Sequence, residues 1–164
     1  IGGVNGMKNS FDLAEIGRYV YGNDYHFFPT QHTKAVYQVV SVDYFVNGCP
    51  VYISELVRVL KCALRGIPYY VPDYAVCVEC KRNENVCMYD KGVTCMGPVT
   101  RAGCNSWCVN NGNICYGCRG MVSNPNENGM RDVIEKYNIS GEFITNKLAM
   151  YNKCKELIEK NDEE

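Results

Sequence analysis

Eight of the eleven cysteines in this 164-residue chain lie between Cys77 and Cys118. They follow the pattern C-x2-C-x6-C-x7-C-x8-C-x3-C-x6-C-x2-C, with a C-x-x-C pair at each end. Four thiolates are the ligand set of one four-iron cluster or of one structural zinc ion, so eight thiols can form two complete sets. The pattern therefore predicts a segment that binds two metal centres. Iron–sulfur clusters that transfer electrons are the first interpretation.

Two other uses of the cysteines compete with clusters. Disulfide-rich secreted domains are short, whereas here the flanking segments carry ordinary core-forming sequence. Zinc ribbons separate their C-x-x-C pairs by roughly 15–20 residues, but 34 residues with four more cysteines lie between Cys80 and Cys115. Spacing alone still permits two zinc sites. A zinc-stabilised structural or interaction module without redox function is therefore the alternative function.

Composition restricts the class of protein further. The chain is 46% apolar and has a formal net charge of −1, which excludes a disordered chain and predicts no nucleic-acid partner. No apolar run reaches the roughly 18 residues of a membrane span, so none is expected. The chain opens at Ile1 instead of Met, and we expect it to be part of a longer protein, in which case a missing targeting signal is uninformative.

The elements that position the cysteines follow from the apolar pattern. Residues 35–46 (AVYQVVSVDYFV) are apolar on both faces, which is typical of a strand buried in a parallel sheet. After Pro50, apolar residues repeat at helical spacing as far as Leu64, and Gly66 provides a stop signal. Cys49 is thus expected at the carboxyl end of a strand, where ligands bind in open α/β sheets. A lone buried thiol is the other interpretation of Cys49.

We predict an α/β fold class and three zones along the chain. The first zone (1–68) is part of an α/β domain, with a helix over Phe11–Tyr21. The second zone (69–128) has little periodicity and is expected to depend on its metals. The third zone (129–164) is predicted to hold two packing helices, one over Met130–Tyr137 and one over Phe143–Ile158.

Charged and histidine side chains give weaker signals. Lys81, Arg82 and Arg101 flank the cysteines and are candidates for tuning a metal centre or docking a partner, although solvated surface charge is the commoner use of such residues. His26 and His32 lie outside the cysteine segment and lack metal-ligand spacing, so neither is predicted to be a ligand.

The order of the motifs resembles a known family. Gly48-Cys49-Pro50 precedes the predicted helix, and Cys77-Val78-Glu79-Cys80, the C-x-G-P-x-T-x-A-G-C block over 95–104 and C-Y-G-C-R-G over 115–120 follow it. Together they resemble the small subunit of nickel–iron hydrogenases, most of all the cytosolic, multimeric type of anaerobic archaea and bacteria, such as sulfhydrogenase delta subunits. The resemblance covers residues 2–128.

The resemblance implies a flavodoxin-like domain followed by a segment that holds two 4Fe–4S clusters. It assigns four cysteines to a distal cluster, here named the outer set: Cys77, Cys80, Cys87 and Cys95. It assigns four more to a medial cluster, here named the inner set: Cys104, Cys108, Cys115 and Cys118. Cys108 is the ligand that relatives with a three-iron medial cluster lack. Spacing alone would also permit interleaved sets.

By the same resemblance, Cys49 matches the last ligand of a third, proximal cluster. The family supplies the other three proximal ligands upstream, but no cysteine precedes Cys49 here. We therefore expect a proximal cluster only if missing N-terminal ligands are supplied, and a fragment explains their absence better than a naturally shortened protein.

The resemblance implies that the chain is a non-catalytic, cytoplasmic electron-transfer subunit of a hydrogenase complex. Its expected partners are the nickel–iron large subunit and a flavin- or ferredoxin-like electron-transfer subunit.

Overall fold

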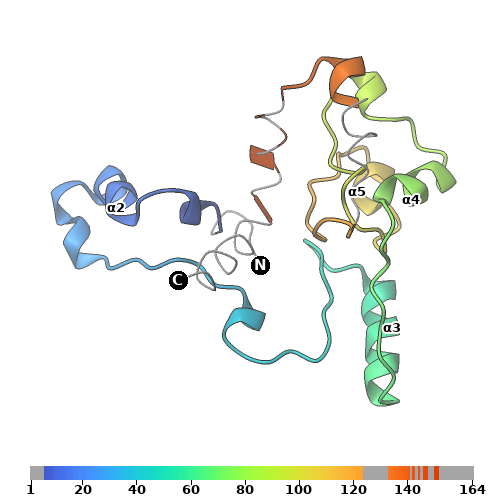
Figure 1. Ribbon diagram of the computed structural model, residues 1–164, viewed down its shortest axis with the longest axis horizontal. Coiled ribbons are helices and arrows are strands. Elements are labelled where there is room, and N and C mark those ends of the chain that lie inside the picture. Colours follow the sequence, from blue (N-terminus) through green and yellow to red (C-terminus); the bar gives the residue numbers. More distant parts are fainter. Residues whose placement is uncertain are drawn as a thin grey trace. The chain divides into compact units, whose positions relative to one another are not determined.

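The computed structural model of the chain describes residues 6–123, 133–140, 142, 144, 146, 147, 150 and 151. The chain divides into two compact units, one made of Ile1–Val42 with Leu148–Glu164 and one made of Asp43–Lys147. Figure 1 labels α2 in the first unit and α3, α4 and α5 in the second. Among the described helices, none is long and apolar enough to cross a membrane.

The first unit contains short helical elements. They are η1 (Lys8–Ser10), α2 (Leu13–Tyr21), η2 (Gly22–Phe27) and η3 (Val36–Gln38). The side chain of Asp12 caps α2, because it accepts a hydrogen bond from the backbone N–H of Glu15 at 2.8 Å. The helix predicted over Phe11–Tyr21 is therefore present, but it begins two residues later, at the residue that follows this cap.

Residues 35–46 do not form the predicted strand. The segment contains the single turn η3, and Val39 and Val40 are 69% and 54% exposed. In the described part of the chain, β-pairing is limited to isolated bridges. A strand is stable only beside another strand, so a β-prone segment without a neighbour stays irregular. The α/β class and the parallel sheet remain predictions.

Helix α3 (Ile53–Leu64) is the first described helix of the second unit. It ends in a Schellman motif: the N–H of Ile67 donates to the carbonyl of Cys62 at 2.9 Å, and the N–H of Gly66 donates to Ala63 at 3.1 Å. Gly66 has φ +63°, which a residue without a Cβ adopts readily. The helix and its glycine stop are as predicted.

The remaining elements of the second unit are short and surround the cysteines. They are α4 (Val76–Arg82), η4 (Tyr89–Lys91) and α5 (Trp107–Asn110). Residues 133–137 are helical, and the ring of Tyr137 stacks on Tyr89 with centroids 5.3 Å apart. This agrees with the first C-terminal helix where it is described, whereas its start lies outside the described residues. The second predicted helix, over 143–158, is described only at scattered positions, and these are helical.

The core of the second unit is the block over 95–104. The N–H of Met96 donates to Cys115 O at 2.9 Å, and the N–H of Val76 donates to Thr100 O at 2.9 Å. The bridges Ala75↔Arg101 and Thr100↔Met121 continue this pairing. The block thus lies between the start of α4 and the segment that follows Cys115. Backbone hydrogen bonds of this kind hold three cysteine-bearing stretches together without a regular sheet. The three-zone division of the chain stays a prediction.

Candidate metal centres

The outer set comes from α4 and the two loops that follow it. Cys77 and Cys80 lie three residues apart on α4, so one face of the helix carries both thiols. Cys87 is exposed in the next loop, and Cys95 is buried at the start of the central block. Each of these four thiols is close enough to interact electrostatically with every other. The four thiols of the outer set therefore lie in one region of the second unit, and their binding of a single cluster stays a prediction.

Gly97 lets the backbone approach the outer set closely. A Cβ at this position would lie 3.1 Å from Cys77 Sγ and 3.5 Å from Cys95 Sγ. Cys95 Sγ also accepts hydrogen bonds from the backbone N–H of Gly97 and from that of Cys115, the latter at 3.2 Å. Such N–H donors stabilise negative charge on sulfur, and they tune the potential of a cluster when one is bound.

The inner set is less uniform. Cys108 lies on α5, Cys104 precedes it, and Cys118 follows the C-Y-G turn. Cys104, Cys108 and Cys118 each interact electrostatically with the other two. Cys115 interacts with Cys118 and also with Cys95 of the outer set. Cys104, Cys108 and Cys118 thus form a group, and Cys108 and Cys115 both also interact with Cys95 of the outer set. The assignment of Cys115 to the inner set stays a prediction.

Backbone N–H groups also point at inner-set sulfurs. The N–H groups of Ser106 and Trp107 donate to Cys104, and the N–H of Gly117 donates to Cys115. Asn105 and Ser106 have φ +54° and +48°, a left-handed pair that turns successive N–H groups to one side. Concave arrangements of this kind bind anionic groups, and a thiolate is one.

Burial raises the pKa of the thiols. Burial and the other three outer cysteines raise the pKa of Cys77 to about 12. Burial likewise raises the pKa of Cys115 to about 12, and it raises the pKa of Cys95 and Cys104 as well. Buried thiolates close to one another are unstable unless a positive charge compensates them. Bound metal ions supply that charge, so the donor set fits a metal centre and releases protons on binding one.

Cys49 lies beside the inner set. It is exposed, so the interpretation of a lone buried thiol is wrong. Its backbone N–H donates to Cys118 Sγ, and its thiol interacts electrostatically with Cys108 and Cys118. The Cys49–Pro50 peptide is cis. Its predicted role as a ligand of a third cluster stays a prediction.

The described cysteines bear on the disulfide and zinc alternatives. The ten described cysteines are all free, which argues against the disulfide interpretation. Among the described residues, no three His, Cys, Asp or Glu side chains are placed to hold a single metal ion. A tetrahedral zinc ion with Zn–S bonds of about 2.3 Å needs sulfurs about 4 Å apart. Whether the outer set binds a zinc ion or a four-iron cluster stays a prediction.

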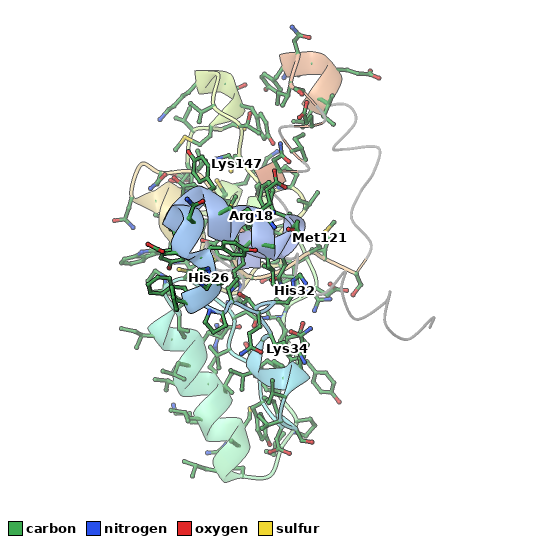
Figure 2. The ribbon with its side chains drawn as sticks, turned by 90° about the vertical axis from the view of Figure 1, so that its left-hand side faces the viewer. Arg18, His26, His32, Lys34, Met121 and Lys147 are labelled. Atoms are coloured by element: carbon green, nitrogen blue, oxygen red, sulfur yellow. The ribbon has the colours of Figure 1, made fainter. Side chains whose placement is uncertain are left out.

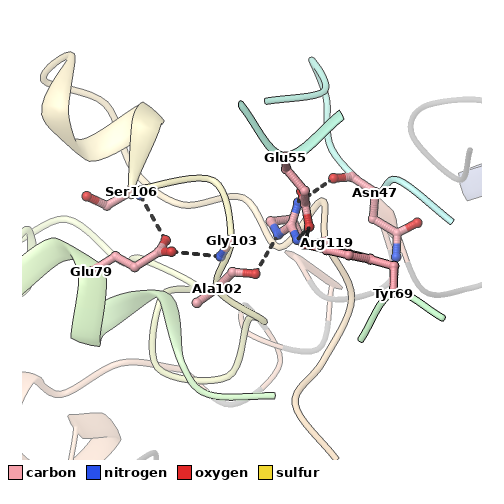
Figure 3. Close-up of polar contacts among 8 residues, drawn as sticks. All are labelled: Asn47, Glu55, Tyr69, Glu79, Ala102, Gly103, Ser106 and Arg119. Carbon is pink, nitrogen blue, oxygen red and sulfur yellow. Dashed lines mark hydrogen bonds and ion pairs between the residues drawn. The ribbon is translucent and has the colours of Figure 1, made fainter. Parts of the chain in front are cut away.

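Glu79 joins the outer set to the inner set. It lies between Cys77 and Cys80 on α4, and its carboxylate accepts hydrogen bonds from the N–H of Gly103 at 2.8 Å and of Ser106 at 3.1 Å (Figure 3). These two residues flank Cys104 closely in sequence. Glu79 therefore fixes the Cys104 loop against α4, a role that sequence reasoning missed. Its position between the two cysteines of C-V-E-C was the only feature of the sequence that pointed to this role.

A second missed feature is a buried ion pair between Arg119 and Glu55 (Figure 3). The sequence offered Lys81, Arg82 and Arg101 as candidates for tuning or docking, with solvated surface charge as the commoner use of such residues. The first two are exposed, and Arg101 pairs with Asp73 at 3.5 Å on the partly exposed surface. The position of Arg119 directly after Cys118 was the feature of the sequence that could have pointed to this ion pair.

The two histidines belong to the first unit, as their sequence positions require (Figure 2). His26 Nδ1 lies 2.9 Å from the carbonyl oxygen of Asn23, and its ring is 4.1 Å from that of Phe27. These local contacts indicate a structural role for His26.

Comparison with known proteins agrees with the motif resemblance. No model of a known protein family matches the chain. The chain is 38% identical over 152 residues to the delta subunit of sulfhydrogenase 2 of Pyrococcus furiosus, covering 92% of this chain and 62% of that protein. It is 27% identical over 183 residues to the G-type subunit of an F420-non-reducing hydrogenase of Methanocaldococcus jannaschii, covering 93% and 64%.

A further relative is the G-type iron–sulfur subunit of an F420-non-reducing hydrogenase of Archaeoglobus profundus, 27% identical over 128 residues, covering 61% of this chain and 40% of that protein. The chain thus spans less than two thirds of the length of these relatives. Over most of its own length the chain is similar to hydrogenase subunits of the delta type and the G type, as its cysteine motifs predicted.

Proposed function

We propose that this chain carries electrons within a nickel–iron hydrogenase complex, through 4Fe–4S clusters bound by the outer and inner sets. The observation that carries the proposal is the outer set, in which the four thiols interact pairwise and Cys95 accepts hydrogen bonds from two backbone N–H groups. The names of the relatives, which are hydrogenase subunits and in one case an iron–sulfur subunit, support the same function.

The chain's own residues bind, orient and shield the centres. Iron–sulfur clusters supply one-electron redox chemistry when bound. The thiolates of the two sets are the ligands, and the N–H groups of Gly97 and Cys115 hold Cys95 Sγ in place. Cys95 and Cys115 are buried, which keeps water from the region where the two sets meet. The hydrogen bond from Cys115 N–H to Cys95 Sγ links one set to the other.

The partners follow from the same proposal. Every C-x-x-C pair in the sequence belongs to the outer or inner set, so hydrogen activation belongs to a nickel–iron large subunit. A flavin- or ferredoxin-like subunit exchanges electrons with the outer set, and the complex is cytoplasmic. Residues 1–68 are then the C-terminal part of a flavodoxin-like domain, and Cys49 serves a proximal cluster where further ligands are supplied. Helix α3 after Gly48-Cys49-Pro50 supports this placement.

Metal analysis of protein purified anaerobically tests the proposal. We expect about eight iron and eight sulfide ions per chain, because two four-iron clusters hold that number, and a brown absorption spectrum. Stoichiometric zinc without sulfide, in a colourless protein, would favour the structural zinc module instead. The chain alone should not reduce dyes with hydrogen, whereas its complex with the large subunit should.

A further inference from the structure

The guanidinium of Arg119 and the carboxylate of Glu55 form a bidentate ion pair in the interior of the second unit (Figure 3). Arg119 is 2% exposed and Glu55 is 1% exposed. Arg119 Nη2 donates to Glu55 Oε1 at 2.6 Å, and Nη1 donates to Oε2. Glu55 Oε1 also accepts from the hydroxyl of Tyr69 at 3.1 Å. Removing two charges from water is unfavourable, and hydrogen bonds of this number and geometry offset it.

The same guanidinium ties together three segments that carry cysteines. Its Nε donates to the carbonyl of Ala102 at 2.9 Å, and its Nη1 donates to the carbonyl of Asn47 at 2.6 Å (Figure 3). Ala102 lies two residues before Cys104, Asn47 lies two residues before Cys49, and Arg119 itself follows Cys118. A single side chain thus fixes the backbone next to each of these cysteines.

The absence of a side chain at Gly103 leaves room for the ion pair. A Cβ at Gly103 would lie 2.5 Å from Arg119 Nη2 and 3.1 Å from Glu55 Oε1, and its φ is +115°. Only a residue without a side chain lets the pair pack directly against the residue before Cys104. The ion pair and the inner set are therefore neighbours, with no side chain at position 103 between them.

The position of Arg119 also makes it the fixed cation of this site. Its guanidinium interacts electrostatically with Cys104 and Cys118. Charges shielded from water and salt act more strongly on their neighbours than surface charges do. Arg101, which is partly exposed, lacks this advantage.

We propose that Arg119, with Glu55 as its counter-ion, sets the reduction potential of the cluster bound by the inner set and positions the segments of Cys49, Cys104 and Cys118. The inference rests on the proposed function. Reduction adds one electron from a one-electron carrier to the cluster, and no bond is formed or broken. Since the added charge is negative, the buried guanidinium stabilises the reduced state and raises the potential.

The test is a redox titration of the complete, anaerobically purified hydrogenase complex, followed by electron paramagnetic resonance of each cluster. Arg119→Gln should lower the potential of the inner cluster, because the cation is lost. Glu55→Gln should raise it, because the cation loses its counter-ion. The outer cluster should keep its potential in both variants. Opposite shifts from the two ends of one pair are not expected from a purely structural role.

Matched variants complete the design. Arg119→Lys keeps the charge and should leave the inner potential close to that of the parent while lowering the unfolding temperature. Arg101→Gln removes a partly exposed cation and should leave both potentials unchanged. Should a single variant fail to fold, the double variant with Gln at both positions 55 and 119 leaves no unpaired buried charge. Its inner potential should be lower than that of Arg119→Lys.

The outcomes separate the two levels of inference. Inner potentials that do not move, or that move in the same direction in both single variants, would overturn the role of Arg119 while leaving the clusters in place. A parent complex in which this chain contains no sulfide-bridged iron would overturn the proposed function, and this inference with it.

Discussion

Replacing Gly103 by alanine should destabilise the second unit through the Arg119–Glu55 pair. The added methyl carbon would lie 2.5 Å from Arg119 Nη2, which is well inside van der Waals contact. A flexible arginine could ordinarily move aside, but this one is held at Nε, Nη1 and Nη2 by hydrogen bonds. The substitution therefore separates the buried pair or shifts the backbone that precedes Cys104.

The magnitude follows from two contributions. Breaking a buried ion pair costs about 3–5 kcal/mol, and a left-handed backbone costs a residue with a Cβ about 1–2 kcal/mol. Gly112→Ala is the matched control, because Gly112 has φ +75° and nothing lies within 4 Å of its Cβ position. The control should show only the backbone contribution. We expect the two variants to differ by about 3 kcal/mol, or roughly 10 °C in unfolding temperature for a chain of this size.

The assay is thermal unfolding monitored by circular dichroism, with both variants prepared anaerobically at the same iron content. Equal metal loading matters, because a bound centre raises the apparent stability of any variant that retains it. Unfolding temperatures of Gly103→Ala and Gly112→Ala that agree within about 3 °C, roughly the effect of 1 kcal/mol, would refute the reasoning from the ion pair.

Three further predictions concern single residues. Gly97→Ala should push Cys77 Sγ or Cys95 Sγ away, because a Cβ at this position would lie 3.1 Å and 3.5 Å from these two sulfurs. Metal–ligand distances tolerate deviations of only about 0.2 Å, so the iron content should fall from about eight to about four per chain. An unchanged iron content would contradict this prediction. Cys108→Ala should give the inner cluster a three-iron electron paramagnetic resonance signal, and spectra identical to the parent would show that Cys108 is not a ligand. Tyr69→Phe should destabilise the chain by about 1.5–3 kcal/mol at neutral pH, because a hydrogen bond to charged Glu55 is lost. Burial first, and then Glu55, raise the pKa of Tyr69. Its contribution to the stability of the fold is therefore present below its usual pKa near 10 and is lost as pH rises through the higher pKa of the folded state. Chemical unfolding as a function of pH should show a smaller loss of stability at alkaline pH in the variant than in the parent, and equal losses would contradict this prediction.

The sequence by itself determined the features that depend on near neighbours. The spacing of eight cysteines predicted a segment that binds metal centres, whereas the division into an outer and an inner set came from the family resemblance and stays a prediction. Apolar periodicity after Pro50 and the stop at Gly66 predicted α3, because helical hydrogen bonds and caps are made within a few residues. The order of the motifs also predicted the relationship to hydrogenase subunits.

Features that depend on distant partners were not visible in the sequence. Residues 35–46 have strand composition, but strand formation requires a neighbouring strand, and this segment is irregular. The resemblance assigns Cys108 and Cys115 to the inner set, and only the tertiary structure shows that both also interact with Cys95 of the outer set. Arg119 and Glu55 are 64 residues apart. Their charges look like ordinary solvated groups until the fold removes both from water, since charged side chains are stable in the interior only when packing brings a partner to them.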